Sequence, residues 1–343
     1  MEHILIIRLS AMGDVAMTVP VIRALVAQYP QVKVTVVSRP FFRPFFEEME
    51  RVHFFGADLR ERHKGFMGIY RLFLDLKKLD IGYVADFHDV LRSKILRTFF
   101  KLSGARTAFT DKGRAEKKAL TRIKDKIFLQ LKPMVQRHAD TMQKLGFNVN
   151  LSHPGFPSKC ELPVSLLAVT GKKDGKKWIG IAPFAQHSTK VYPTDLMADL
   201  ILKLASDPKY RLFLFGSKDE TGQLIKMQQN LSNVQVVAGS VSFTEELQLI
   251  RHLDVMLSMD SGNAHIAAMY GVPVVSLWGQ THPYAGFAPF NQPSANSFTS
   301  DRTKYPLIPT SIYGNKEVPG YEDAMRTIAP ETVIQRIIFI LNS

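Results

Sequence analysis

Asp14 is the first carboxylate in the chain whose surroundings suit chemistry. It follows the apolar run 4–9 and the turn Ser10-Ala11-Met12-Gly13, in which Gly13 permits a tight passage from strand to helix. Asp14 then stands at the carboxyl end of a strand and beside the positive end of a helix, which favours a negatively charged side chain. The alternative is that Asp14 only caps the helix, and spacing alone favours the cap.

A second candidate site lies between residues 257 and 268. A strand ends in Asp260-Ser261-Gly262-Asn263, and an alanine-rich helix begins at once. The free backbone N–H groups of such a helix start bind anions, phosphate above all. An ordinary capping sequence, with His265 as a partly buried helix residue, explains the pattern equally well, so both interpretations stay open.

Two further polar residues follow predicted strands. Lys190 lies in the loop after the strand 179–183, where a lysine could neutralise a phosphate. Glu220 follows the turn at Gly216, where a carboxylate could accept hydrogen bonds from ribose hydroxyls. A solvated lysine and an exposed first-turn glutamate are the alternatives.

Several motifs are absent from the sequence. It has no Gly-x-Gly-x-x-Gly fingerprint, which disfavours a nicotinamide oxidoreductase, and no Gly-Lys-Ser/Thr loop. Asp-x-Asp and zinc-ligand spacings are absent too, so no metal and no cofactor are expected. The single cysteine, Cys160, fits a reducing compartment. A phosphate site would therefore depend on a helix dipole, backbone N–H groups and lysine.

Hydrophobic periodicity predicts strands that alternate with helices. In the first half, strands are expected at 4–9, 32–37, 52–55 and 81–86, with 89–146 mostly helical apart from a short strand near 105–109. After an aperiodic linker at 148–159, strands are expected at 178–182, 212–215, 234–237, 255–258 and 274–277. Residues 284–319 are expected as loops, and a last helix starts near 330. The pattern predicts two doubly wound α/β domains, 1–155 and 156–343, with the last helix able to pack back on the first.

Composition and charge limit the class of protein. With 45% hydrophobic and 22% charged residues, the chain is neither disordered nor fibrous. The net charge of +13 lies almost entirely in residues 1–150, which hold 27 basic and 15 acidic side chains. Within them, residues 92–132 hold 13 basic and three acidic side chains. No apolar run is long enough to cross a membrane. We expect a cytoplasmic protein whose membrane contact, if any, is peripheral.

Four segments together resemble glycosyltransferase family 9, the heptosyltransferases of the lipopolysaccharide inner core. The opening Ile-Leu-Ile-Ile-Arg-Leu-Ser-Ala-Met-Gly-Asp14 is similar to the N-terminal signature of that family. Asp260-Ser261-Gly262 with His265, followed by Trp278-Gly279-Gln280-Thr281-x-Pro283, is similar to its C-terminal signature. Lys190 before Tyr192-Pro193, and Glu220 after Gly216, fall where the family has donor-binding residues.

The resemblance implies a GT-B fold of two Rossmann-like domains facing a cleft. It also implies inverting, metal-independent transfer from a nucleotide diphosphate sugar, typically ADP-heptose, to an anionic lipopolysaccharide core, with ADP as product. Asp14 would be the catalytic base on the N-terminal acceptor domain. The donor-binding residues on the C-terminal domain would be Thr189, Lys190, Glu220, Val241, Asp260, Ser261, Gly262, Asn263 and His265. The acceptor-binding residues would be Ser10, Met12, Gly13, Arg114, Lys117 and Lys118.

The sequence departs from the family pattern at two places, and alternatives follow. Asn263 and Ala264 replace a usual proline and methionine near the donor sugar, and His282 replaces a usual aspartate before Pro283. One alternative is a GT-B transferase that uses another sugar or a GDP- or UDP-linked donor. An alternative of another class is a basic nucleic-acid-binding protein, which is disfavoured because no recognition motif for nucleic acid is present. The basic stretch 92–132 has two interpretations: an ordinary solvated helix face, or, as we hypothesise, a surface that attracts an acidic glycolipid and the anionic membrane that carries it.

Overall fold

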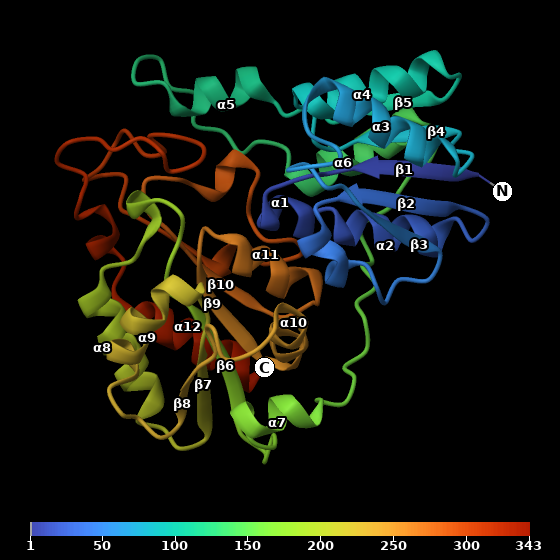
Figure 1. The fold of residues 1–343 in the computed structure, drawn as a ribbon. Coiled ribbons are helices and arrows are strands. Elements are labelled where there is room, and N and C mark those ends of the chain that lie inside the picture. The colour runs from blue at the N-terminus through green and yellow to red at the C-terminus, as the bar shows by residue number, and fades with distance from the viewer. Residues whose placement is uncertain (1) are drawn as a thin grey trace. The chain divides into compact units, whose positions relative to one another are not determined.

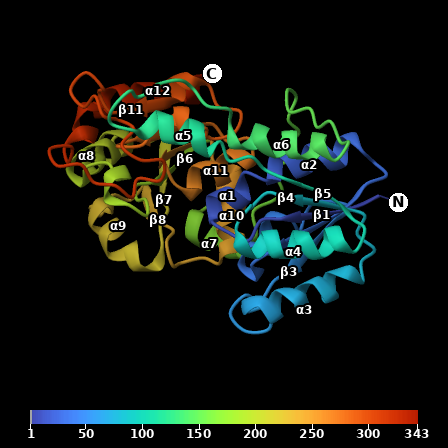
Figure 2. The same ribbon diagram turned by 90° about the horizontal axis from the view of Figure 1, so that it is seen from above.

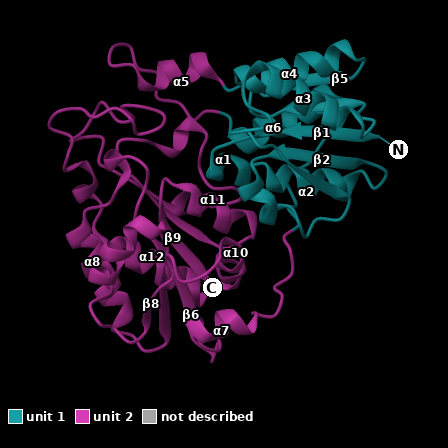
Figure 3. Cartoon of the chain, in the orientation of Figure 1, with its two compact units in different colours: residues 1–112, 132–155 teal, residues 113–131, 156–343 magenta. Residues whose placement is uncertain are grey.

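The computed structural model describes residues 2–343, in which strands and helices alternate along the chain (Figure 1). Two compact units are present, coloured separately in Figure 3. The first unit comprises Met1–Lys112 and Lys132–Gly155, and the second comprises Gly113–Leu131 and Phe156–Ser343. The expected boundary at 155/156 therefore separates the units except at residues 113–131, which were expected in the first domain and belong to the second unit.

The first unit is built on a parallel sheet with the strand order β3-β2-β1-β4-β5. The strands are β1 (His3–Ile7), β2 (Lys33–Ser38), β3 (Val52–Gly56), β4 (Tyr83–Asp86) and β5 (Arg106–Phe109). All five residues of β1 are buried, as expected for a central strand covered on both faces. The loops after β1, β2, β3 and β4 therefore meet along one edge of this sheet.

Helices cover both faces of the first sheet (Figure 2). They are α1 (Met12–Ala16), α2 (Val19–Gln28), α3 (Gly65–Lys77), α4 (Leu91–Leu102) and α6 (Met134–Lys144). On one face, α3 and α4 bury Leu72, Leu76 and Phe100 in a core shared with Leu5 and Val84 of the strands. On the other face, α2 lies beside α6.

The second unit is built on a parallel sheet with the order β11-β10-β9-β6-β7-β8. Its strands are β6 (Lys177–Ala182), β7 (Tyr210–Leu214), β8 (Val234–Val236), β9 (Val255–Met259), β10 (Val274–Trp278) and β11 (Ser297–Thr299). Its helices are α5 (Arg114–Thr121), α7 (Val164–Thr170), α8 (Thr194–Ala205), α9 (Thr221–Gln228), α10 (Phe243–His252), α11 (Gly262–Met269) and α12 (Pro330–Asn342). The two doubly wound parallel α/β domains expected from periodicity are confirmed.

The structure corrects the expected positions of several elements. The expected helical stretch 89–146 is interrupted, because residues 122–133 between α5 and α6 are irregular. Helix α7 and strand β11 were not expected. The last helix, α12, buries Val333, Ile337 and Leu341 in the core of the second unit. The sequence left open that this helix packs back on the first domain, and its buried face lies in the core of the second unit.

Segment 113–131 is held on the second unit by side-chain and backbone contacts. Phe128 stacks on Tyr284 with ring centroids 4.8 Å apart, and the Leu131 N–H donates to the Tyr284 carbonyl at 2.9 Å. The Lys126 ammonium donates to the carbonyls of Leu307 and Pro309. Burial and the nearby charge of Arg302 lower the pKa of Lys126 to about 8. Hydrophobic periodicity cannot reveal such contacts, because they join residues far apart in sequence.

Within residues 2–343, no helix combines the length and apolar character needed to cross a bilayer.

Candidate active site

Asp14 lies in the first turn of α1, directly after β1 and its loop. The Ala11 N–H donates to Asp14 Oδ2 at 3.3 Å, which is one half of a capping interaction, so the cap suggested by spacing is present. The Arg8 guanidinium lies 2.5 Å from the same Oδ2. The Asp14 side chain is still 29% exposed, and its Oδ1 has no hydrogen-bond partner within residues 2–343. Asp14 therefore has one oxygen fixed and the other open to a substrate.

Arg8 fixes Asp14 and was not identified from the sequence. Its Nε donates to the Ser10 carbonyl and its Nη1 donates to the Phe87 carbonyl, both at 2.8 Å, and the residue is buried. Charge-assisted bonds of this kind hold a side chain in one orientation. Gly13, expected to provide the tight turn, instead lies inside α1. The turn is made by residues 8–11.

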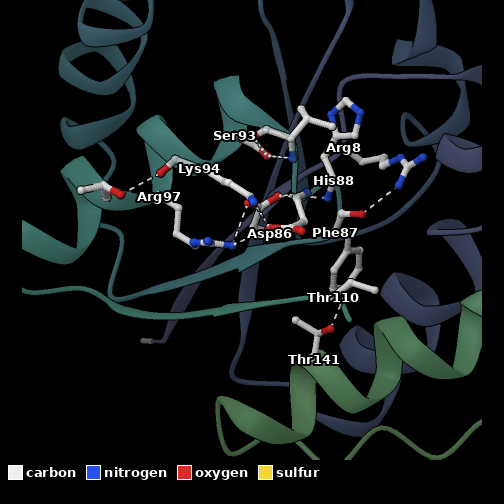
Figure 4. Close-up of polar contacts among 12 residues, drawn as sticks. Arg8, Asp86, Phe87, His88, Ser93, Lys94, Arg97, Thr110 and Thr141 are labelled. Carbon is white, nitrogen blue, oxygen red and sulfur yellow. Dashed lines mark hydrogen bonds and ion pairs between the residues drawn. The ribbon is translucent and has the colours of Figure 1, made fainter. Parts of the chain in front are cut away.

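The loop after β4 carries His88 toward Arg8 (Figure 4). Burial and the positive charge of Arg8 lower the pKa of His88 to about 3, so its imidazole is neutral at physiological pH. Asp86 holds this loop by accepting hydrogen bonds from the backbone N–H groups of His88 and Asp89 and by pairing with Arg97 at 3.0 Å. Burial raises the pKa of the Asp86 carboxyl, while these bonds and Arg97 act in the opposite direction.

Two adjoining cavities open at the carboxyl edge of the first sheet. One, of about 380 Å³, is lined by Ser10 and His88 among others, and the other, of about 660 Å³, by Phe41 and Asp58 among others. Arg39 and Arg92 line both cavities, and Arg60 lines the larger one. The three exposed guanidinium groups form no ion pair within residues 2–343. This arrangement suits an anionic ligand with some apolar surface.

The arginines of these cavities were missed by the sequence analysis. Arg39 follows β2, Arg60 follows β3 and Arg92 follows β4. Parallel strands bring these loops to one edge, where ligands of such sheets bind. The signal in the sequence was therefore an arginine shortly after each of three predicted strands.

In the second unit, Asp260 lies between β9 and α11 and contacts one predicted site residue, Lys190, and one residue of the C-terminal signature, Thr281. Lys190 Nζ lies 3.3 Å from Asp260 Oδ2, and the Thr281 hydroxyl donates to the same oxygen at 2.9 Å. Lys190 follows β6 and Thr281 follows β10, so neighbouring strands β10, β9 and β6 supply the cluster. A phosphate bound here would share Lys190 with a buried carboxylate.

Helix α11 begins immediately after this cluster. Its N-cap residue Ser261 turns its hydroxyl toward the Ser258 hydroxyl, 3.0 Å away, instead of capping the helix. The side-chain Oδ1 of Asn263 is buried and lacks a hydrogen-bond partner within residues 2–343. Gly262 opens the helix, and His265 is buried one turn further on. The helix start therefore keeps backbone N–H groups and a polar side chain for a ligand.

Thr189 differs from its expected role. Its hydroxyl donates to the Gly314 carbonyl at 2.5 Å, and its own carbonyl accepts from the Gln280 N–H at 3.0 Å. A Cβ at Gly279 would lie 2.1 Å from that carbonyl oxygen, so glycine is required there. Thr189 thus anchors the loop that presents Lys190, and its side chain is occupied within the protein.

Glu220 and Val241 lie farther along the same edge of the second sheet. Glu220 follows β7 and accepts hydrogen bonds from the Ser217 N–H at 2.7 Å and the Ser217 hydroxyl at 2.9 Å. The first-turn capping alternative is therefore realised for Glu220. Val241 follows β8 and precedes α10. The strand order places Asp260, Lys190, Glu220 and Val241 in sequence along one edge, as a ligand the length of a nucleotide sugar would need.

The basic residues of α5 lie in the second unit, which corrects their expected place on the acceptor domain. Arg114 and Lys118 are exposed there. Lys117 is buried, with its Nζ 4.2 Å from the centre of the Phe287 ring. The Lys117 ammonium is therefore engaged with an aromatic ring of the second unit, and its contact with an acceptor stays a prediction.

His282 also has a structural role. Its ring lies 4.9 Å from Phe128 and 4.5 Å from Tyr284, and its Nδ1 accepts from the Tyr284 N–H at 3.1 Å. Burial, with a smaller contribution from Arg302, lowers the pKa of His282 to about 4. His282 therefore anchors segment 113–131 as a neutral ring.

Comparison with known proteins identifies the family. A family model described as glycosyltransferase family 9 (heptosyltransferase) matches residues 69–311. Lipopolysaccharide heptosyltransferase 2 of Escherichia coli K12 is 26% identical over 368 aligned positions that cover 98% of each chain.

Two solved structures cover the whole fold. A family 9 glycosyltransferase from Veillonella parvula matches with a TM-score of 0.76, 16% identity and coverage of 99% and 97% of the two chains. The E. coli heptosyltransferase WaaC with ADP-2-deoxy-2-fluoro heptose matches with a TM-score of 0.67, 17% identity and coverage of 99% and 100%. The GT-B fold implied by the sequence resemblance is confirmed. The protein is a glycosyltransferase, and the chain belongs to glycosyltransferase family 9, the heptosyltransferases.

Proposed function

We propose that this protein transfers heptose from ADP-heptose to the inner core of lipopolysaccharide, with inversion and without a metal ion or other cofactor. The observation that carries the donor side is the cluster of Lys190, Asp260 and Thr281 at the start of α11. The named substrates come from relatives: a lipopolysaccharide heptosyltransferase and a heptosyltransferase with an ADP-heptose analogue.

The second unit binds the donor in this proposal. The ADP diphosphate lies at the start of α11, where the backbone N–H groups and Lys190 meet the negative charge that grows as ADP leaves. Asn263, with its buried oxygen, accepts a hydrogen bond from a donor hydroxyl. Glu220 exchanges its hydrogen bonds with Ser217 for hydrogen bonds with the ribose hydroxyls of ADP. The backbone at Val241 contacts the adenine.

Asp14 is the catalytic base in this proposal. As the acceptor oxygen bonds to the anomeric carbon, its proton passes to Asp14 Oδ1, and the bond from that carbon to the phosphate oxygen breaks with its electron pair leaving on ADP. Arg8 holds Oδ2 and keeps the carboxylate oriented. No further group is needed to balance protons and electrons.

The acceptor binds in the first unit. Arg39, Arg60 and Arg92 are assigned to the carboxylates or phosphates of the inner core. Ser10 lines the smaller cavity, and its carbonyl accepts from the same Arg8 that holds Asp14. In this proposal the positively charged side chains of the first unit bind an anionic glycolipid and not nucleic acid. The enzyme then works at the cytoplasmic face of the inner membrane, as a peripheral protein.

The test is transfer with purified components. Wild-type protein, ADP-heptose and a lipopolysaccharide acceptor that ends in the deep core should give a product one heptosyl residue heavier by mass spectrometry. UDP- and GDP-linked sugars should give no product, and ADP should bind more tightly than UDP or GDP by calorimetry. Transfer only from another nucleotide sugar would refute the assignment of ADP-heptose.

Asp14→Asn tests the base. We expect ADP affinity to be unchanged and transfer to fall by about 100- to 10,000-fold. Asp174→Asn removes an exposed carboxylate elsewhere and should transfer like wild type. Full transfer by Asp14→Asn would eliminate Asp14 as the base.

A further inference from the structure

Helix α3 is apolar on two faces, although only one of them is needed for the core. Ile69, Leu72 and Leu76 point into the first unit. On the outer face, Phe66 is 61% exposed, and Met67, Tyr70 and Leu74 are exposed as well. Soluble proteins seldom keep several large apolar side chains together on one outer helix face unless something binds there.

Helix α4 extends this apolar surface. The Phe99 ring lies 5.9 Å from Phe66 and 5.5 Å from Tyr70, so the two helices present one continuous aromatic surface. Leu102, at the end of α4, is 80% exposed. We call this surface the α3–α4 face, and it comprises Phe66, Met67, Tyr70, Leu74, Phe99 and Leu102. Figure 2 shows both helices along the same side of the first sheet.

Exposed basic side chains outnumber exposed acidic ones on α3, on α4 and at their ends. These basic side chains are Lys64, Arg71, Lys77, Lys78, Arg92 and Lys101. Helix α4 contains no acidic residue. On α3, the single carboxylate Asp75 is already paired with Arg62 at 2.7 Å. Basic side chains on the same helices as exposed aromatic and aliphatic ones complement an anionic lipid surface, where rings enter the headgroup region and cations contact phosphates.

We propose that the α3–α4 face docks the first unit on an anionic bilayer. Leu91 and Arg92 at the start of α4 also line the arginine cavities. One helix therefore joins the docked surface to the cavity, and a membrane-anchored acceptor reaches the arginines from the lipid side. That last step rests on the proposed function, whereas the docking itself does not.

The docking test uses full-length protein and vesicles. Wild-type protein should sediment with vesicles of phosphatidylethanolamine and phosphatidylglycerol but not with phosphatidylcholine alone, and binding should weaken as salt rises. The triple variant Phe66→Ser, Tyr70→Ser, Leu74→Ser should bind the anionic vesicles at least about tenfold more weakly. The matched control, Ile225→Ser with Phe339→Ser, removes exposed apolar side chains of the second unit and should bind like wild type.

Kinetics separate docking from the transferase proposal. With a delipidated acceptor, the triple variant should match wild-type kcat/KM, which also shows that it is folded, and with acceptor in anionic vesicles it should fall about tenfold. Vesicle binding by the triple variant equal to wild type, or no binding by wild type, would overturn the docking face. If wild type failed to bind vesicles but bound a partner protein, the docking of the α3–α4 face on a bilayer would also be overturned. Loss of transfer by wild type with both acceptors would overturn the proposed function and leave the vesicle result to decide the docking face.

Discussion

Lys190→Met offers the most detailed test of the donor site. Lys190 and Asp260 are 13% and 10% exposed and lie 3.3 Å apart, so the variant leaves a mostly buried carboxylate without its cation. Removing one partner of a buried pair costs about 3–5 kcal/mol. Because Thr281 still donates to Asp260, we expect the lower end, about 3 kcal/mol of unfolding free energy.

The same variant should weaken ADP binding for a separate reason. One charge-assisted phosphate contact is worth about 1.5–3 kcal/mol, which corresponds to about a 10- to 150-fold loss of affinity. The double variant Lys190→Met, Asp260→Asn removes the orphaned charge as well. It should therefore recover most of the stability and none of the affinity for ADP.

Urea unfolding and calorimetric titration with ADP measure the two effects separately. Lys172→Met, at an exposed lysine outside the cluster, is the matched control and should behave as wild type in both. ADP binding by Lys190→Met at wild-type affinity would refute the role of Lys190 in the donor site. A double variant as unstable as the single one would refute the explanation by an uncompensated carboxylate.

Three further predictions concern the acceptor cavity, a close backbone contact and acid stability. Arg39→Ala and Arg92→Ala should each raise the acceptor KM about tenfold while the KM for ADP-heptose stays unchanged in steady-state assays; a rise in the donor KM instead would contradict the assignment. Gly279→Ala brings a Cβ within 2.1 Å of the Thr189 carbonyl oxygen and should lower the unfolding free energy by about 1–3 kcal/mol or more in urea; wild-type stability would contradict the contact. The pKa of His282 is lowered to about 4 in the folded protein, so as pH falls below about 6.5 the histidine is protonated in the unfolded chain before it is protonated in the folded one. Protonation therefore stabilises the unfolded chain, and the unfolding free energy of wild type should fall by about 2 kcal/mol between pH 7 and pH 5 because of this residue. In the variant His282→Asn, the asparagine can still accept the capping hydrogen bond but does not titrate. Its unfolding free energy in urea should therefore fall by about 2 kcal/mol less than that of wild type between pH 7 and pH 5. An equal fall in both proteins would contradict the lowered pKa of His282.

The positions of the proposed donor-site residues could be predicted because these residues follow strands that periodicity reveals. Lys190, Glu220 and Asp260 each come directly after an apolar run, and parallel strands bring their carboxyl ends to one edge. The sequence could not predict which partners these side chains have within the protein. Thr189 is bound to Gly314 and Lys190 to Asp260, and both contacts join distant parts of the chain.

The acceptor side was predicted less well. Counting charge located a basic stretch at 92–132, but Lys117 is buried over Phe287, and residues 113–131 belong to the second unit. The arginines that line cavities are single residues after three strands and contribute little to any local count. Charge density along the chain therefore indicated an anionic ligand but did not point to the cavities that these arginines line.

The sequence by itself determined the alternating α/β pattern, the two parallel sheets, the loops that carry Asp14 and Asp260, and the membership in family 9. Those features follow from local periodicity, turn residues and short motifs, and each of these signals lies within a short stretch of the sequence. Only the tertiary structure decided that Arg8 fixes one oxygen of Asp14, that Arg39, Arg60 and Arg92 share a cavity edge, and that α12 stays in the second unit. These contacts join residues far apart in the chain, and the packing of whole elements, rather than any local preference, sets which side chains meet.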